Sequence, residues 1–211
     1  MRPLTYTLVA DGSSDECLKH VINWVLKQEA RSTGPLLITP QFADYGARPG
    51  PPKRLSDKLR LVVQDYPCDL LFIHRDAERE DPDQRRTEIL AAARASGFEP
   101  IVSIVPVRMT EAWLLFNESA IRHASGNPSG RVKLNLPPLQ RLEKEPDPKE
   151  VLERLLVMAS EASGRRLKQF ERNLPKLKPR VAELIEDFSP LRRLEAFSRF
   201  ENELKDALSR R

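Results

Sequence analysis

Cysteine is scarce in this chain of 211 residues, which contains only Cys17 and Cys68. Because the two are far apart in the sequence, we expect neither a disulfide framework nor a zinc site, and a reducing cytoplasm is the simplest location. No apolar run approaches the roughly 20 residues that a transmembrane helix needs. The first residues, Met1 to Leu4, also lack the apolar region of a secretory signal. We therefore expect a cytoplasmic protein that has no membrane partner.

Glycine is also rare, with 8 copies against 18 prolines, and the prolines mostly mark predicted element boundaries. The sequence has no internal repeat and no low-complexity segment. Its 40% hydrophobic and 31% charged residues describe a globular protein with a heavily charged surface. The net charge of +4 permits nucleic-acid binding without demonstrating it. The length suits one core, or one domain with a helical extension.

Apolar runs alternate with amphipathic segments in the first half of the chain. Strands are predicted at 4–10, 36–39, 70–74 and 101–107, and helices at 15–33, 55–66, 83–97 and from 109 onward. This alternation is typical of an α/β fold with a largely parallel sheet flanked by helices. The segment 123–148 is polar and proline-rich, and the rest has helical patterns only. We predict an α/β domain over 1–125, and a linker with a helical C-terminal extension over 126–211 that packs on it.

Carboxylates follow three of the predicted strands. Asp76 and Glu78 come after the buried run that begins at Leu70, Asp11 follows the first strand, and Glu111 follows the fourth. The carboxyl ends of parallel strands meet at one edge, where open α/β sheets bind their ligands. Gathered carboxylates either raise a pKa or bind a cation, and oxygen donors suit Mg²⁺ or Mn²⁺. This edge is the predicted site.

Each of these acids also has a structural interpretation. Asp11-Gly12 is a common turn dipeptide, and Glu78 can pair in solvent with a neighbouring arginine. Glu111 suits the positive end of a helix dipole. Asp76 has the fewest structural alternatives, because it closely follows a strand buried on both faces.

Four other residues near this edge are assigned to structure first. Asp15 and Glu16 fit a helix start behind a serine cap, with one of them facing the metal through a water as the alternative. His74 fits a core position, with proton transfer as the alternative. Trp113 fits core packing, with stacking on a nucleic-acid base as the alternative.

Basic residues gather on and after the glycine- and proline-rich loop 41–52. Arg48, Lys53 and Arg54 are predicted to contact nucleic-acid phosphates, and a solvated face is an equal alternative. In the tail, the basic runs 165–168 and 176–180 have glutamates nearby. There we favour a charged helical face packed on the sheet domain over a nucleic-acid or partner surface.

Several of these motifs resemble those of TOPRIM domains. The run Ala10–Asp15 is similar to their glutamate-glycine motif, and Asp76-Ala77-Glu78 to their acid-x-acid pair at a strand end. The segments 106–115 and 147–149 resemble the uncharacterised bacterial DUF4276 group, so the resemblance covers most of the chain. Asp11 stands where the superfamily usually has glutamate, and Glu78 where aspartate is common. Both keep a carboxylate and change its reach by one methylene.

The resemblance implies a TOPRIM-like (Rossmann-like) fold and a Mg²⁺-dependent nuclease or related phosphoryl-transfer protein. In the superfamily, which includes primases, topoisomerases and OLD-type nucleases, such acids bind Mg²⁺ for strand cleavage or synthesis. By this resemblance Asp76 and Glu78 hold the metal, Glu111 assists, and Asp11 is the acid/base or a further ligand. An ATPase partner and a role as effector of an anti-phage defence system are also implied, with DNA, RNA and a homo-oligomer left open.

Two rival functions remain. A catalytically silent binding or regulatory subunit that docks on an ATPase is compatible with the shorter Asp11 and the modest basicity. A small-molecule phosphohydrolase is less favoured, because the sequence shows no nucleophile paired with a base.

Overall fold

The computed structural model describes residues 2–46, 50 and 52–210. Its first half contains β1 (Arg2–Val9), α1 (Leu18–Thr33), β2 (Leu36–Phe42), α2 (Leu55–Asp65), β3 (Leu70–His74), α3 (Pro82–Ser96) and β4 (Ile101–Ile104). Its second half contains the helices α4 (Glu118–Ala124), α5 (Pro148–Ser160), α6 (Gly164–Glu171), α7 (Leu177–Leu184) and α8 (Glu195–Ser209). Short 3₁₀ helices lie between them, namely η1 (Ser13–Cys17), η2 (Thr110–Leu114), η3 (Leu139–Lys144), η4 (Leu174–Lys176) and η5 (Ser189–Arg193).

The described residues form one four-stranded sheet in the order β2-β1-β3-β4, and every pairing is parallel. Tyr6 lies opposite Leu70, and Leu71 lies opposite Ile101. Parallel strands need crossover connections, which the intervening helices provide. The predicted α/β fold with a parallel, helix-flanked sheet is therefore confirmed, and it is of a Rossmann-like kind.

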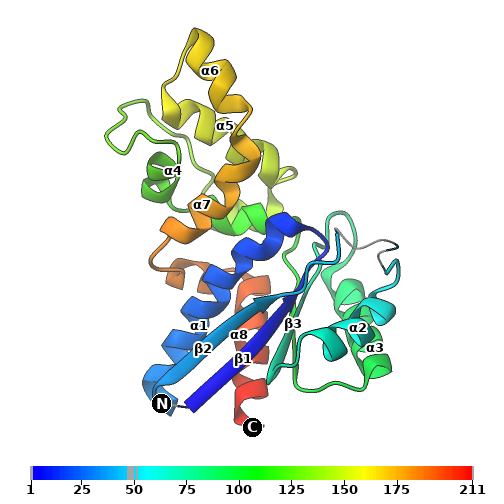
Figure 1. Ribbon diagram of the computed structural model, residues 1–211. Helices are drawn as coiled ribbons and strands as arrows, with labels where there is room; N and C mark the ends of the chain where they lie inside the picture. Colours follow the sequence, from blue (N-terminus) through cyan, green and yellow to red (C-terminus); the bar gives the residue numbers. More distant parts are fainter. Residues whose placement is uncertain (1, 47–49, 51, 211) are drawn as a thin grey trace.

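The sheet is the middle of three layers (Figure 1). Tyr6 and Phe72 point toward α1 and α8, whereas Leu71 and Ile73 point toward α2 and α3. All five residues of β3 are buried, as the uninterrupted apolar run predicted. The edge strand β2 is half-exposed and contains Pro40, which has no N–H to donate and is tolerated at an edge.

Helix α8 forms part of the core beneath the sheet. The Phe200 ring lies 6.3 Å from that of Phe72 and 6.1 Å from that of Trp113. Trp113 is fully buried, so it is a core residue. The predicted division at residue 125 stays a prediction, but the last helix shares one hydrophobic cluster with β1 and β3. No helix in the described ranges combines the length and hydrophobicity that a membrane crossing requires.

Four local predictions were wrong in detail. No serine side chain caps the first helical segment, whose N-cap is Gly12. Strand β2 continues to Phe42 instead of ending at Thr39, and β4 ends at Ile104 instead of Val107. The helix expected from Met109 is only the 3₁₀ turn η2. The first three differences lie at element ends, which local patterns locate only to within a few residues, and the fourth replaces an expected helix by a short turn.

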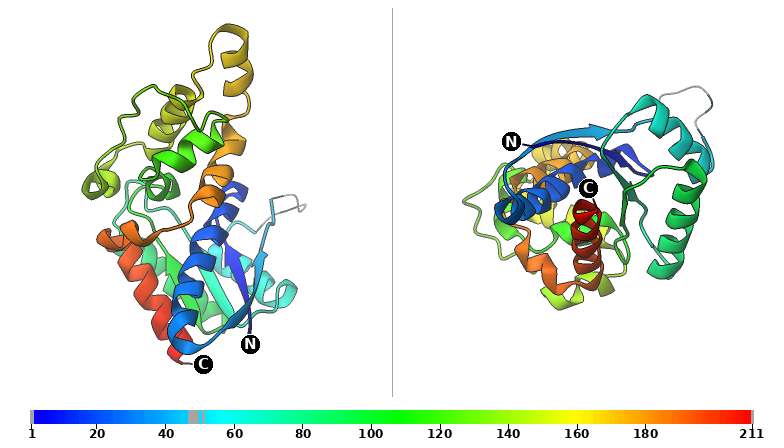
Figure 2. Two further views of the ribbon diagram at one scale, coloured as in Figure 1. Left: turned by 90° about the vertical axis from the view of Figure 1, so that its left-hand side faces the viewer. Right: turned by 90° about the horizontal axis from the view of Figure 1, so that it is seen from below.

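Helices α4 to α7 stand beyond the carboxyl ends of the strands (Figures 1 and 2). Helix α7 touches η1, η2 and α1, all close to those strand ends. Helix α6 extends farthest from the sheet and contains no buried residue. The second half of the chain thus brings side chains to the edge where the sequence predicts a site.

Replacing Phe200 by Ala should lower the free energy of unfolding by about 3–5 kcal/mol, because the cavity would lie between the sheet and Trp113. The matched control is Leu90→Ala on α3, whose side chain is 40% exposed; its effect should be much smaller. Urea denaturation followed by circular dichroism measures both. Equal losses for the two variants would contradict the packing of α8 beneath the sheet.

Candidate functional site at the carboxyl edge of the sheet

The strand order changes direction at β1. From β1 the chain crosses to β2 on one side of β1, while β3 and β4 lie on its other side. Connections that diverge in this way leave room between the carboxyl ends of the two strands where they part. The loop after β1 enters η1, and the loop after β3 contains Asp76. The predicted acids therefore come from the position where such folds bind ligands.

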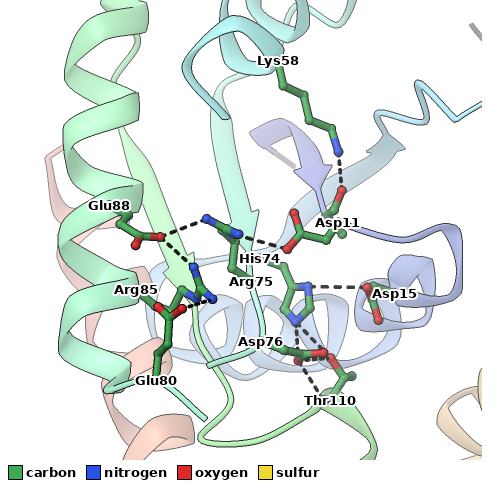
Figure 3. A network of polar contacts seen from close by, with 11 residues as sticks. Asp11, Asp15, Lys58, His74, Arg75, Asp76, Glu80, Arg85, Glu88 and Thr110 are labelled. Atoms are coloured by element: carbon green, nitrogen blue, oxygen red, sulfur yellow. Dashed lines mark hydrogen bonds and ion pairs between the residues drawn. The ribbon is translucent and has the colours of Figure 1, made fainter. Parts of the chain in front are cut away.

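Polar side chains at this edge form two clusters, one on each side of the sheet (Figure 3). His74 is on the α1 side and Arg75 on the α3 side, because successive residues of a strand point to opposite faces. The buried cluster consists of Asp15, His74, Asp76, Thr110, Glu111 and Lys178. The surface cluster consists of Asp11, Lys58, Arg75, Arg85 and Glu88.

In the buried cluster, Asp76 is held by β3 and η2 together. Its Oδ1 accepts the backbone N–H of Thr110 at 3.0 Å and lies 3.1 Å from Nε2 of His74. The Thr110 hydroxyl lies 3.0 Å from the same His74 nitrogen. Nδ1 of His74 points toward Asp15 Oδ2 at 3.7 Å, which is too long for a hydrogen bond. Asp76 is thus fixed, while its side chain stays 24% exposed.

Lys178 of α7 joins two other carboxylates of the buried cluster. Its Nζ donates to Asp15 Oδ1 at 2.8 Å and lies 3.1 Å from Glu111 Oε1. All three residues are buried, with 8% or less of their surface exposed. Buried charges are tolerated only when they are paired and hydrogen-bonded, so the two acids and the lysine depend on one another. This contact also fixes α7 to η1 and η2.

For both Lys178 and Asp76, neighbouring groups shift the pKa in the direction opposite to the shift that burial causes. Burial alone would lower the pKa of Lys178, but Cys17, Glu111 and Asp15 raise it above its ordinary value. Burial alone would raise the pKa of Asp76, but His74, Lys178 and the Thr110 N–H lower it below its ordinary value. Lys178 is therefore an ammonium and Asp76 a carboxylate at neutral pH.

Asp11 belongs to the surface cluster and has a different partner. Its Oδ2 lies 3.2 Å from Nε of Arg75, which also pairs with Glu88 at 2.9 Å. Lys58 donates to the carbonyl of Ala10, and burial lowers the pKa of Lys58 more than Asp11 raises it. Asp11 therefore lies at the predicted edge, but Arg75 already neutralises it on the other side of the sheet from the buried cluster.

The remaining predicted residues lie outside the buried cluster. Glu78 is exposed and has a positive φ of 54°. Its N–H donates to the backbone carbonyl of Arg108, and its own carbonyl accepts a hydrogen bond from the Arg108 guanidinium. This conformation is uncommon for a residue with a Cβ. Lys53 and Arg54 are exposed before α2, and Arg48 lies outside the described residues. The structure thus unites Asp76 and Glu111 in one cluster and separates Asp11 and Glu78 from it.

Sequence reasoning missed Lys178 and Thr110, and it assigned Asp15 and His74 mainly to structure. The signal for Asp15 was available, because it follows Asp11 by four residues at the entry of a helix. Thr110 precedes Glu111 and was masked by the apolar run that follows. Nothing local marks Lys178, since it reaches the site from a helix 163 positions after Asp15.

The donor chemistry of the buried cluster suits a hard cation. In the described ranges, no group of three or more His, Cys, Asp or Glu side chains is arranged to hold a metal ion. Two carboxylates nevertheless enclose a positive charge, which the Lys178 ammonium supplies. The carboxylate oxygens of Asp15, Glu111 and Asp76 are the donor type that Mg²⁺ and Mn²⁺ prefer, and the Lys178 ammonium occupies the position between the first two.

Comparisons with known proteins give no family assignment. No protein-family model matches the chain, and neither the search of curated proteins nor that of solved structures found a match.

Cys17, beside the buried cluster, should resist alkylation in the native protein. Burial raises the pKa of its thiol to about 12 from an ordinary 9.0, so the reactive thiolate is scarce at pH 8. Half-buried Cys68 should react first with iodoacetamide, as followed by mass spectrometry. Because the folded pKa is the higher one, the stability linked to this thiol is present below pH 9 and is lost as pH rises toward 12. Faster labelling of Cys17 would contradict this environment.

Proposed function

We propose that the protein is a divalent-cation-dependent phosphoryl-transfer protein, most simply a nuclease of TOPRIM-like type, which acts at the carboxyl edge of its sheet. One observation carries the proposal. Carboxylates from η1, η2 and the segment after β3 lie at the carboxyl edge of the sheet, and two of them hold the Lys178 ammonium between them. The resemblance of Ala10–Asp15 and Asp76–Glu78 to TOPRIM motifs supports the same chemistry.

Asp15, Asp76 and Glu111 would hold the cation, with Glu78 and Asp11 as the further candidates that the resemblance implies. When bound, Mg²⁺ would neutralise charge that develops on a transferring phosphoryl group. The chain's own groups then have distinct tasks. The Thr110 N–H and His74 orient Asp76, and Lys178 supplies positive charge next to Glu111. Asp11 can act as acid or base only if Arg75 releases it.

The favoured substrate is nucleic acid, because a basic arm stands beyond the site. We define the basic arm as α6 and η4 with the residues between them, 164–176. Its exposed basic side chains have no ion-pair partner among the described residues; they are Arg165, Arg166, Lys168, Arg172 and Lys176. Glu171 is the single acid in this segment. A row of unpaired cations on a projecting helix suits a phosphate backbone.

A second candidate function is a catalytically silent binding or regulatory subunit that docks on an ATPase. The pairing of Asp15 and Glu111 with Lys178 favours it, because the same contacts suffice as a structural clamp. The two functions differ in whether nucleic acid is cleaved when Mg²⁺ or Mn²⁺ is present. An effector role in anti-phage defence belongs to either proposal.

Replacing Asp76 by Ala should reduce metal-dependent cleavage of DNA or RNA by at least about 100-fold, because the cluster loses its most accessible carboxylate. Gel assays with single-stranded, double-stranded and RNA substrates measure the rate. The control is Asp57→Ala on α2, an exposed acid that pairs with Arg60, which should leave the rate unchanged. The thermal midpoint of Asp76→Ala shows whether it folds. Equal cleavage by the wild type and this variant would remove the proposed mechanism, and no cleavage by the wild type would favour the silent subunit.

Replacing Arg165, Arg166 and Lys168 together by Gln should weaken nucleic-acid binding and make its affinity less dependent on salt concentration. Each lost phosphate contact changes the slope of log K against log salt by about 0.9 for duplex DNA. Fluorescence anisotropy at several salt concentrations measures this. The comparison variant is Lys53→Gln with Arg54→Gln, which tests the surface predicted from the sequence. An effect confined to the comparison variant would place the nucleic acid at α2 instead of the basic arm.

A further inference from the structure

Lys178 fills a position that a free cation could also fill. Lys178 is the residue of α7 that belongs to the buried cluster. Its Nζ lies within 3.1 Å of the carboxylates of Asp15 in η1 and Glu111 in η2. Only 8% of the residue is exposed. An ammonium in this position meets the same electrostatic need as a metal ion.

The buried cluster retains negative charge in spite of Lys178. Asp15, Asp76 and Glu111 are acids, and Lys178 is the permanent cation that contacts two of them. A second, independent observation is the unpartnered Nδ1 of His74, which is buried and has no hydrogen bond. His74 is 1% exposed and this nitrogen points at Asp15. Buried polar atoms without partners are rare in folded proteins and mark places where a ligand, ion or water completes the contacts.

Space for an exchange of occupants lies beside the lysine. A cavity of about 130 Å³ has Ser14, Glu111, Lys149, Glu153 and Lys178 among its lining residues. Since a water needs about 10–15 Å³ of such volume, the cavity has room for several waters or for a rotated lysine side chain. The flexible four-carbon stem of Lys178 can swing into it while α7 stays anchored by the buried Val181 and Ala182.

We propose that Asp15 and Glu111, with Asp76 beside them, form a cation site whose internal occupant is the Lys178 ammonium, so that Lys178 and an external divalent cation exclude each other. This inference rests on the cation site of the proposed function but not on nuclease activity. Only molecules in which Lys178 has left the site can bind the metal, so the apparent affinity is the intrinsic affinity multiplied by the fraction of such molecules. While metal is absent, Lys178 also holds the carboxylates and α7 in one arrangement.

The test compares Lys178→Met with Lys133→Met. Methionine keeps an unbranched side chain and removes the charge, and Lys133 is an exposed lysine that belongs to neither the buried cluster nor the basic arm. Mn²⁺ binding is measured from the loss of the free-ion signal in electron paramagnetic resonance. K178M should bind Mn²⁺ on the order of tenfold more tightly than the wild type, whereas K133M should match the wild type. K178M should also have a lower thermal midpoint, which Mn²⁺ restores.

Adding Asp15→Asn or Glu111→Gln to K178M should abolish the gain in Mn²⁺ affinity. The inference is overturned if K178M binds Mn²⁺ no more tightly than K133M, or if the gain survives without Asp15 and Glu111. Cleavage assays are separate: a gain in Mn²⁺ affinity without cleavage by any form would end the nuclease proposal and leave the cation site standing.

If K178M does not fold, hydrogen exchange on the wild-type protein decides the question. With about 10 mM Mn²⁺, the amides of α7 should exchange faster, because its link to η1 and η2 is replaced by the ion. Helix α3, on the other face of the sheet, serves as the internal reference. Unchanged exchange in α7 would overturn the inference.

Discussion

The contact of Lys178 with Asp15 and Glu111 is the constraint on which the carboxyl edge of the sheet depends. Two carboxylates can be buried there only because a cation lies between them. The same contact ties three distant segments together, since Asp15 follows β1, Glu111 follows β4, and Lys178 belongs to α7. The hydrophobic cluster around Phe72 and Phe200 fixes the layers, and this ion pair fixes what stands above the edge. Packing and electrostatics thus act on different parts of the chain.

The pleat of β3 explains why the predicted acids form two clusters instead of one. His74 and Arg75 are neighbours in the sequence but point to opposite faces of the sheet, so each lies near a different aspartate. Asp15 lies on the α1 side with His74, and Asp11 lies on the α3 side with Arg75. A parallel topology therefore brings the acids to one edge but does not by itself bring them to one point. Each acid pairs with a base on its own side of the sheet, Asp11 with Arg75 and Asp15 with Lys178.

Local patterns were enough to predict the layers of the fold, and they fell short where distant segments decide. The stripe from Leu18 to Leu26 and the run from Leu70 to Ile73 are buried as predicted, because periodicity reports directly which face meets the core. Asp76 was predicted as a site residue from its place after a buried strand, and it lies in the buried cluster. Lys178 could not be predicted in this way. Its role comes from how α7 packs on η1 and η2, which no short pattern around Lys178 encodes.

The chemistry of this edge follows from the difference between an ammonium and a metal ion with the same neighbours. An ammonium donates hydrogen bonds and is tethered to its helix, so it balances charge and holds α7 in place. A divalent cation brings twice the charge and open coordination positions, through which it can bind phosphate oxygens, whereas the Lys178 ammonium already contacts both Asp15 and Glu111. Since Asp76 is oriented by Thr110 and His74 and does not contact Lys178 directly, it is free to serve either occupant. In the described arrangement the lysine occupies the place between two carboxylates, and under the proposed exchange the same carboxylates would bind a metal ion only when the lysine leaves that place.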